Sequence, residues 1–183
     1  TLVTGNLVLP ATVGTVAVTW ASNTPAVVSN AGVVVRPAKG AADATVVLTA
    51  TLTKGTATAT KTFTLTVRAL QYTNQELVDM AVTPLMVGYT AGDTVDMVTG
   101  NVTLAATSNT AAVVWTSDTP AVISNAGVVV RPAKGEANAT VVLTATLTIG
   151  TATATKTFTL TVVATPYTEE EAAAALEISG TTL

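Results

Sequence analysis

The chain repeats itself after 95 residues, and this repeat is the strongest limit on the folds that it can adopt. Only six of the 48 positions from 20 to 67 differ from their counterparts 95 residues later. The upstream match is weaker, with Thr4-Gly5-Asn6 returning at 99–101. Such a period is longer than the roughly 20–50 residues of solenoid repeats, and it suits a small domain that folds by itself. The sequence therefore predicts two copies of one domain.

Each repeat has the pattern of β-strands. Apolar side chains recur at every second position over 16–20, 46–52 and 63–67, which is typical of strands buried on one face. Threonine and valine, which fill much of these runs, favour a pleated surface. The predicted strands are about 6–9, 15–21, 26–28, 33–36, 45–53 and 56–67, with equivalents in the second repeat. Six or seven short strands per repeat indicate an antiparallel sandwich.

A helical signal lies between the two sandwiches. Thr73 and Glu76 have the spacing of a capping box, and Thr83-Pro84 should end the helix. The same box returns at Thr168 and Glu171. We expect a first sandwich over 1–69, a helical linker over 70–90, a second sandwich over 91–166, and a helical tail over 167–183 that is similar to the start of another repeat.

Both repeats carry the same series of short motifs. A strand ends in Trp-x-Ser-x-x-Pro, followed by a Ser-Asn-x-Gly turn, Arg-Pro, Val-x-Leu-Thr-Ala and finally Lys-x-Phe-x-Leu-x-Val. This series resembles the atrophied immunoglobulin-like domains of bacteria over nearly the whole chain. The resemblance implies an all-β fold of two tandem immunoglobulin-like antiparallel β-sandwiches, each preceded or followed by a short helical linker. It also implies an extracellular or cell-surface protein, and it brings no catalytic residues.

The composition excludes several classes of function. Without histidine or cysteine, the chain cannot form serine or cysteine triads, histidine-ligated metal sites or thiol redox centres. A net charge of −3 with only eight Lys+Arg argues against a nucleic-acid surface. The purely apolar runs are too short for membrane insertion. With 11 scattered acids as the main remaining candidates, we expect no enzyme and no cofactor.

The predicted core contains one tryptophan, one leucine and one phenylalanine of each repeat. These residues are Trp20, Leu48 and Phe63, with Trp115, Leu143 and Phe158 as their equivalents. Strand parity points all of them inward, so burial is favoured over a sugar-stacking role for the tryptophans. Truncation of a fully buried phenylalanine to alanine should cost about 3–5 kcal/mol.

Lysines and acids offer two further hypotheses. Lys61 and Lys156 share the inward parity of the phenylalanines. One hypothesis is an internal isopeptide bond to an asparagine, but a strand bulge or a lysine at the sandwich rim is favoured. Asp93, Asp96 and Asp118 could contribute to a calcium site, although a solvated turn is favoured because calcium usually takes six or more oxygen ligands. Asn101 and Asn138 lie in Asn-x-Thr sequons, a pattern of low specificity.

Threonines form an unbroken alternating row over 56–66, and the row returns over 151–161. All of these side chains should face one side of a long strand. A neutral solvent-facing surface and a contact surface between domains or molecules are both favoured interpretations. An ice-binding array is a remote alternative, because the twist of a sandwich opposes a flat surface.

The function expected is that of a spacer, a stalk or a self-assembling building block at the bacterial cell surface, with a glycan-binding or adhesion module as the alternative. The partners expected are other copies of the chain or neighbouring repeats, and otherwise cell wall or glycan. Helix 169–178 should dock beside the first sandwich of another copy, as helix 74–82 docks beside the second sandwich. The two ends of the chain together make up one further repeat, except that seven residues equivalent to 89–95 are missing. A boundary cut through a longer repeat protein would explain this match equally well. The apolar side of the docking helix would consist of Ala172, Ala175, Leu176 and Ile178.

Overall fold

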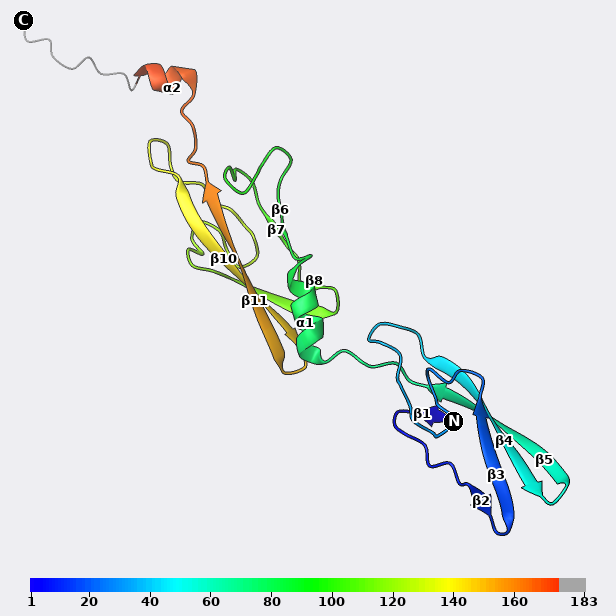
Figure 1. Cartoon of the computed structure of the whole chain (residues 1–183). Helices are drawn as coiled ribbons and strands as arrows, with labels where there is room; N and C mark the ends of the chain where they lie inside the picture. Colours follow the sequence, from blue (N-terminus) through cyan, green and yellow to red (C-terminus); the bar gives the residue numbers. More distant parts are fainter. Residues whose placement is uncertain (175–183) are drawn as a thin grey trace, which may run out of the picture. The chain divides into compact units, whose positions relative to one another are not determined.

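The computed structural model describes residues 1–174 and contains two compact units, Thr1–Tyr72 and the chain from Thr73 onward (Figure 1). Strands dominate both units, and the main sheet of each is largely antiparallel, so the predicted all-β tandem fold is confirmed. The helix expected as a linker over 70–90 is instead part of the second unit. It packs against the strands of that unit, so its apolar side chains contribute to one core.

The first unit is built on a five-stranded sheet. The strands are β1 (Leu2–Val3), β2 (Thr12–Val13), β3 (Val16–Ser22), β4 (Ala44–Lys54) and β5 (Ala57–Val67). Their order in the sheet is β1-β5-β4-β3-β2. Strands β4 and β5 form a long hairpin in which Ala44 lies opposite Val67, and β1 is parallel to β5. The first and last strands of the unit are therefore neighbours.

The second layer of this sandwich is reduced to loops. Val28 and Val34 form a single bridge where two strands were expected over 26–28 and 33–36, and the stretch 6–9 forms no strand. A tight turn separates the two bridge residues, which leaves each arm too short for a regular ladder. Val28 nevertheless packs with Val46 and Leu48, and this contact forms the core of the unit.

The second unit repeats this sheet and adds helices. Its elements are α1 (Asn74–Val82), β6 (Val87–Gly88), β7 (Thr103–Leu104), β8 (Thr107–Ser108), β9 (Ala111–Ser117), β10 (Ala139–Ile149), β11 (Ala152–Val162) and α2 (Glu169–Ala174). The main sheet has the order β11-β10-β9-β8, and β6 pairs with β7 in a separate two-stranded sheet. A single parallel bridge between Val98 and Val162 takes the place of the β1–β5 pair.

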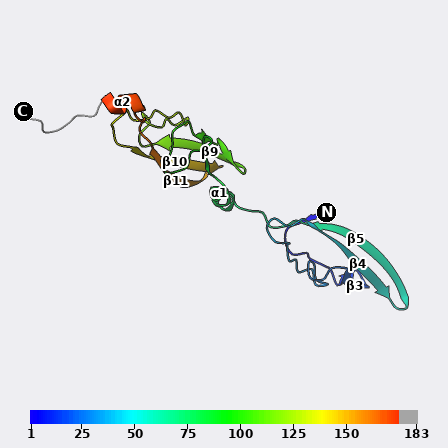
Figure 2. The ribbon, with the colours of Figure 1, turned by 90° about the horizontal axis from the view of Figure 1, so that it is seen from above.

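Helix α1 begins where the capping box predicts. The Thr73 side chain accepts a hydrogen bond from the Glu76 amide at 3.2 Å, and the Glu76 carboxylate accepts one from the Thr73 amide at 2.8 Å. The helix lies beside β10 and β11 (Figure 2) and packs against β9, β10 and β11. Its residues Val78 and Ala81 are fully buried in the core of this unit. Its apolar face thus covers one end of the second sheet.

A glycine in the loop layer is held in a conformation that only glycine adopts easily. Gly32 has a φ of +83°, and a Cβ atom there would lie 2.3 Å from the carbonyl oxygen of Leu7. Gly14 has a φ of +58°, but a Cβ atom would meet nothing within 4 Å. Because the two positions share the left-handed strain and only Gly32 adds a backbone clash, Gly32→Ala should cost about 1–3 kcal/mol more than Gly14→Ala. Urea unfolding of the two variants tests this, and equal losses would contradict it.

Candidate functional site

The chain leaves each sandwich beside the strand by which it enters. In the first unit, the Thr66 amide donates to the Thr1 carbonyl at 2.8 Å, and the Arg68 amide donates to the Val3 carbonyl at 3.0 Å. Because these bonds join parallel neighbouring strands, the entering and leaving segments are tied directly to each other.

An arginine fastens the leaving segment a second time. The Arg36 guanidinium donates from Nε to the Arg68 carbonyl and from Nη2 to the Ala69 carbonyl, both at 2.7 Å. The Asp43 carboxylate accepts from the Ala69 amide at 2.8 Å, and the Leu70 amide donates to the Pro37 carbonyl at 2.9 Å. The planar fork of arginine suits two adjacent carbonyl groups, so the geometry is specific to this side chain. We call Arg36 and Asp43 the exit clamp of the first unit.

The second unit repeats the exit clamp with Arg131 and Asn138. Arg131 donates to the carbonyls of Val163 at 2.8 Å and Ala164 at 2.7 Å, while the Asn138 amide oxygen accepts from the Ala164 amide at 2.9 Å. Asn138 thus replaces Asp43 without loss of the acceptor. The sequon asparagine has a structural role here, and this role was not foreseen from the sequence. The sequence did carry a signal for the clamp, because Arg36 returns as Arg131 in a chain with only eight Lys+Arg.

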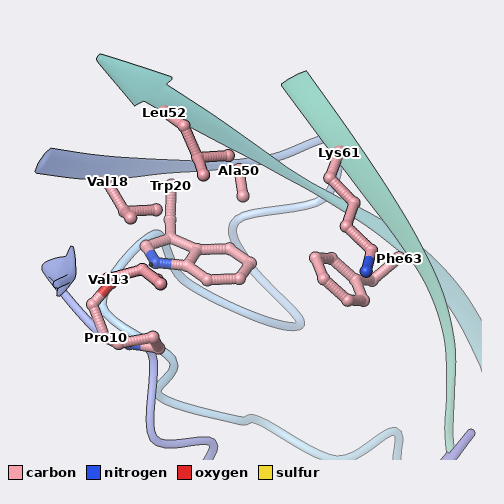
Figure 3. Close-up of a pocket in the computed structure, with 8 residues that line it drawn as sticks. All are labelled: Pro10, Val13, Val18, Trp20, Ala50, Leu52, Lys61 and Phe63. Atoms are coloured by element: carbon pink, nitrogen blue, oxygen red, sulfur yellow. Dashed lines mark hydrogen bonds between the residues drawn. The ribbon is translucent and has the colours of Figure 1, made fainter. Parts of the chain in front are cut away.

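The first unit also has an apolar groove over one end of its sheet, with a volume of about 400 Å³ (Figure 3). The residues that line it are Pro10, Val13, Val18, Trp20, Ala50, Leu52, Lys61 and Phe63. The rings of Trp20 and Phe63 lie 5.6 Å apart between centroids, and the Trp20 indole donates to the Pro10 carbonyl at 2.9 Å. The Lys61 ammonium lies 5.3 Å from the centroid of the Phe63 ring.

In the second unit, α1 covers the equivalent face. The Lys156 ammonium donates to the carbonyls of Val82 at 3.0 Å and Leu85 at 2.7 Å, and it reaches a third carbonyl, that of Thr83, at 3.3 Å. The buried Ser108 hydroxyl donates to the Ala81 carbonyl at 2.6 Å. The free carbonyl groups at the carboxyl end of the helix therefore accept hydrogen bonds from side chains of the sheet.

The six predicted core residues lie in different environments. Leu48, Leu143 and Trp115 are buried, whereas Trp20 and Phe158 are only partly buried. Phe63 is 36% exposed, so its predicted burial is wrong. Phe63 is exposed because it lines the groove. The described residues of the first unit include no helix equivalent to α1 that would cover this face.

Three of the other candidate residues have structural partners. Lys156 binds α1 carbonyl groups, which gives its inward parity a hydrogen-bonding role. Asp93 accepts from the Thr99 amide at 2.8 Å, from the Thr99 hydroxyl and from the Gly100 amide, and these bonds lower the pKa of its carboxyl. Asp118 accepts from the Val142 amide at 2.9 Å in a separate turn. Within residues 1–174, no three acids gather in a way that could hold a metal ion.

The threonine rows lie on the sheet face opposite the groove in the first unit, and on the face opposite α1 in the second. Thr19, Thr51 and Thr60 are in register across β3, β4 and β5, and Thr49 pairs with Thr62 beside them. The threonines of β5 are exposed up to Thr64. This face is uncharged and rich in methyl groups, so it is open to contact with other surfaces.

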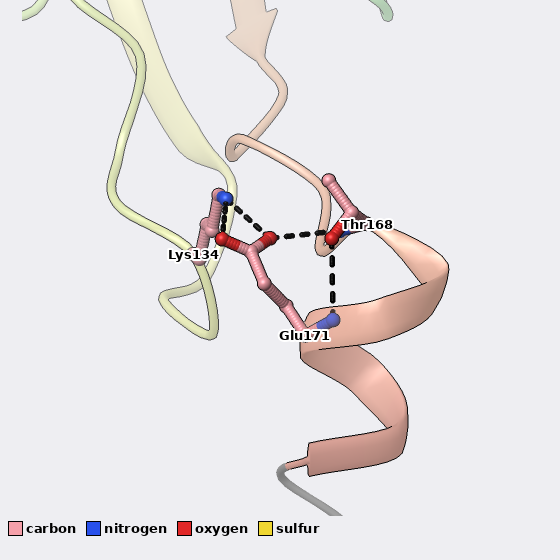
Figure 4. Close-up of polar contacts among 3 residues, drawn as sticks. All are labelled: Lys134, Thr168 and Glu171. Carbon is pink, nitrogen blue, oxygen red and sulfur yellow. Dashed lines mark hydrogen bonds and ion pairs between the residues drawn. The ribbon is translucent and has the colours of Figure 1, made fainter.

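The short helix α2 is tied to the second unit through its capping residue (Figure 4). The Glu171 carboxylate forms an ion pair with Lys134 and accepts from the Thr168 amide at 2.9 Å, while the Glu171 amide donates to the Thr168 hydroxyl at 3.2 Å. The second capping box is therefore formed. Ala172 is exposed, and Ala175, Leu176 and Ile178 lie outside the described residues.

The ion pair makes the attachment of α2 sensitive to acid. Lys134, followed by the Thr168 amide, lowers the pKa of Glu171 from 4.5 to about 2. A lowered carboxyl pKa stabilises the folded form above pH 4.5, and this stabilisation is lost as the pH falls towards about 2. NMR titration of the Glu171 carboxyl carbon should show this depressed pKa, and Lys134→Met should return it towards 4.5. Titration at 4.5 in the unmodified chain would contradict the ion pair.

Comparison with known proteins agrees with the fold. No helix among residues 1–174 is long and apolar enough to cross a membrane. No curated protein matches the chain. The family model of the atrophied bacterial Ig domain matches residues 1–70 and 78–165, once for each unit. Domains of this kind are often extracellular and generally non-catalytic. The chain belongs to the atrophied bacterial Ig domain family.

Proposed function

We propose that the chain is a non-catalytic structural module of a bacterial cell-surface or secreted protein, in which it acts as a spacer that resists tension. The observation that carries this proposal is the exit clamp, which recurs in both units beside the parallel pairing of entering and leaving segments. A spacer needs segments that stay attached when its ends are pulled apart.

The direction of the strands explains why this arrangement resists force. A pull on the two ends of a unit draws β1 and β5 in opposite directions along their length. The hydrogen bonds at Thr66 and Arg68 are then stressed together, because none can open before its neighbours. The fork of Arg36 adds two further bonds on the leaving segment. Forced unfolding depends on the barrier to this first rupture.

The proposal is tested by pulling single chains from their ends. We expect two separate unfolding events, each lengthening the chain by roughly 200–300 Å, because a fully extended residue spans about 3.3–3.6 Å. Arg131→Met should lower the force of the longer event, which belongs to the second unit, and leave the shorter event unchanged. A chain that extends without force peaks would overturn the proposal.

Glycan binding is a second candidate function, because Trp20 and Phe63 form an accessible aromatic pair in the groove. Sugar sites combine an aromatic surface with several well-placed polar groups. In the groove, the Trp20 indole N–H is already bonded to Pro10, and the other polar group that lines it is the Lys61 ammonium. Calorimetric titration with cell-wall oligosaccharides tests this candidate, which predicts saturable binding that Phe63→Ala abolishes.

A further inference from the structure

We propose that the groove of the first unit binds residues 167–183 of a second copy of the chain, seated as α1 is seated in the second unit. This inference goes beyond the spacer function, because the exit clamp needs no contact between copies. The groove and the face under α1 are chemically close. Six of the eight groove residues recur unchanged in the second unit, as Val113, Trp115, Ala145, Leu147, Lys156 and Phe158.

The equivalent sheet face is covered by α1 in the second unit and is exposed at the groove in the first. Val113, Trp115, Ala145 and Leu147 are buried in a core that also includes Val78 and Ala81 of α1. In the first unit, Val13 at the groove is 57% exposed and Phe63 is 36% exposed. This difference in exposure arises from the presence of α1 and not from the sheet, since the sheet residues are almost the same.

The turn of the long hairpin lies beside the first residue of α1 in the second unit, and the equivalent turn of the first unit is open. A Cβ atom at Gly150 would lie 2.5 Å from the Asn74 side-chain nitrogen, at the start of α1. At the equivalent Gly55, a Cβ atom would meet nothing within 4 Å. The space that Asn74 fills in the second unit is therefore open in the first.

The groove also contains a lysine equivalent to the one that binds the carboxyl end of α1. Lys156 donates to three carbonyls at the carboxyl end of α1, where a positive charge is favourable. Lys61 occupies the same position on β5 and is exposed. A helix seated in the groove would place its last carbonyls within reach of Lys61.

The occupant follows from the order of the chain. Helix α1 comes directly after the first unit and packs on the unit that follows it. The segment from Tyr167 leaves the second unit in the same way, and Thr168 and Glu171 already form the same capping box. The two fully buried residues of α1, Val78 and Ala81, correspond to Ala173 and Leu176, so one small and one larger apolar side chain are retained in reversed order.

Two polar contacts of α1 have no equivalent in the groove. Ser108 and Asn109 donate to the Ala81 and Met80 carbonyls, whereas Val13 and Gly14 stand in their places. The contact between copies should therefore be weaker than the contact of α1, and it should depend on concentration. Because it joins different surfaces of the two copies, it extends head to tail and does not close as a twofold dimer.

Cysteine pairs test the contact in the full chain, which has no native cysteine. Gly55→Cys with Glu169→Cys places thiols at the positions equivalent to Gly150 and Asn74. Oxidation should join chains into a ladder on a non-reducing gel. The pair Gly150→Cys with Asn74→Cys is the positive control and should crosslink within one chain. Gly5→Cys with Glu169→Cys is the negative control, because Gly5 lies outside the groove and is equally open.

Sedimentation supplies a second measurement that does not rely on crosslinking. The unmodified chain should associate as its concentration rises, and Val13→Asp should weaken this association at least about tenfold, because the contact would bury an unpaired carboxylate. Val33→Asp is the matched control, since Val33 is 52% exposed and lies outside the groove. The proposal is wrong if the chain stays monomeric, if Val33→Asp has the same effect, or if the Gly55 pair forms no more ladder than the Gly5 pair. A groove that binds only oligosaccharide also overturns it, while the result of the pulling experiment would stand in each case.

Discussion

Leu147→Ala is expected to lower the free energy of unfolding of the second unit by about 3–5 kcal/mol, because this side chain is fully buried beneath α1. The equivalent change in the first unit, Leu52→Ala, should cost roughly 1–2 kcal/mol, because Leu52 lines the open groove and is only partly buried. Residue-resolved urea unfolding by NMR separates the two units in one sample.

The comparison requires a dilute sample, since association between copies would cover Leu52. The two leucines have identical neighbours along the strand, apart from Lys54 in place of Ile149, so local sequence does not explain a difference. Equal costs in dilute solution would mean that α1 contributes nothing to the packing of Leu147. That result would contradict the explanation offered here for the exposure of Phe63.

Lys156→Met should destabilise the second unit by about 2–3 kcal/mol. The change leaves the carbonyls at the end of α1 without a charged donor, and a hydrogen bond to a charged group is worth about 1.5–3 kcal/mol. Methionine keeps much of the apolar stem, so the loss reports mainly on the ammonium group. Lys61→Met, the matched control, should be nearly neutral because Lys61 is exposed. A neutral Lys156→Met, measured by the same unfolding experiment, would contradict the proposed capping role.

Much of the fold could be predicted from the repeat and the period-two pattern. The long hairpin strands predicted at 45–53 and 56–67 agree within one residue at all four ends with Ala44–Lys54 and Ala57–Val67. Alternation is reliable there because both strands are long and bear threonine on one face. The loop layer was harder to predict, since Val28 and Val34 lie in arms too short to show a period.

The difference between the units could not be predicted from the repeated residues. Trp20 and Trp115 occupy equivalent positions in almost identical segments, yet Trp115 is 6% exposed and Trp20 is only partly buried. Residues that are the same in both copies cannot encode a difference between them. The difference comes from α1, which lies outside the repeated 48 residues and packs on the sheet of the second copy.

The partners of the exit clamp could not be predicted from the sequence, although the recurrence of its arginine could be seen there. Arg36 was visible as part of a family motif, but its partners are backbone carbonyls of Arg68 and Ala69, which have no residue type to recognise. The exchange of Asp43 for Asn138 obscured the pattern further, because a carboxylate and an amide share only their acceptor oxygen. The structure shows that this oxygen is the part that both units use.

Moving the point at which force is applied shows whether the parallel entering and leaving segments give the sandwiches their resistance to tension. A Gly5→Cys variant allows force to be applied after β1, so that the bonds between β1 and β5 are bypassed. We predict that the first unit then unfolds at a lower force than when the chain is pulled from Thr1. The second unit, identified by its longer extension in the same molecule, should unfold at an unchanged force. An unchanged force for the first unit would contradict the claim, because it would show that the β1–β5 pair carries no tension.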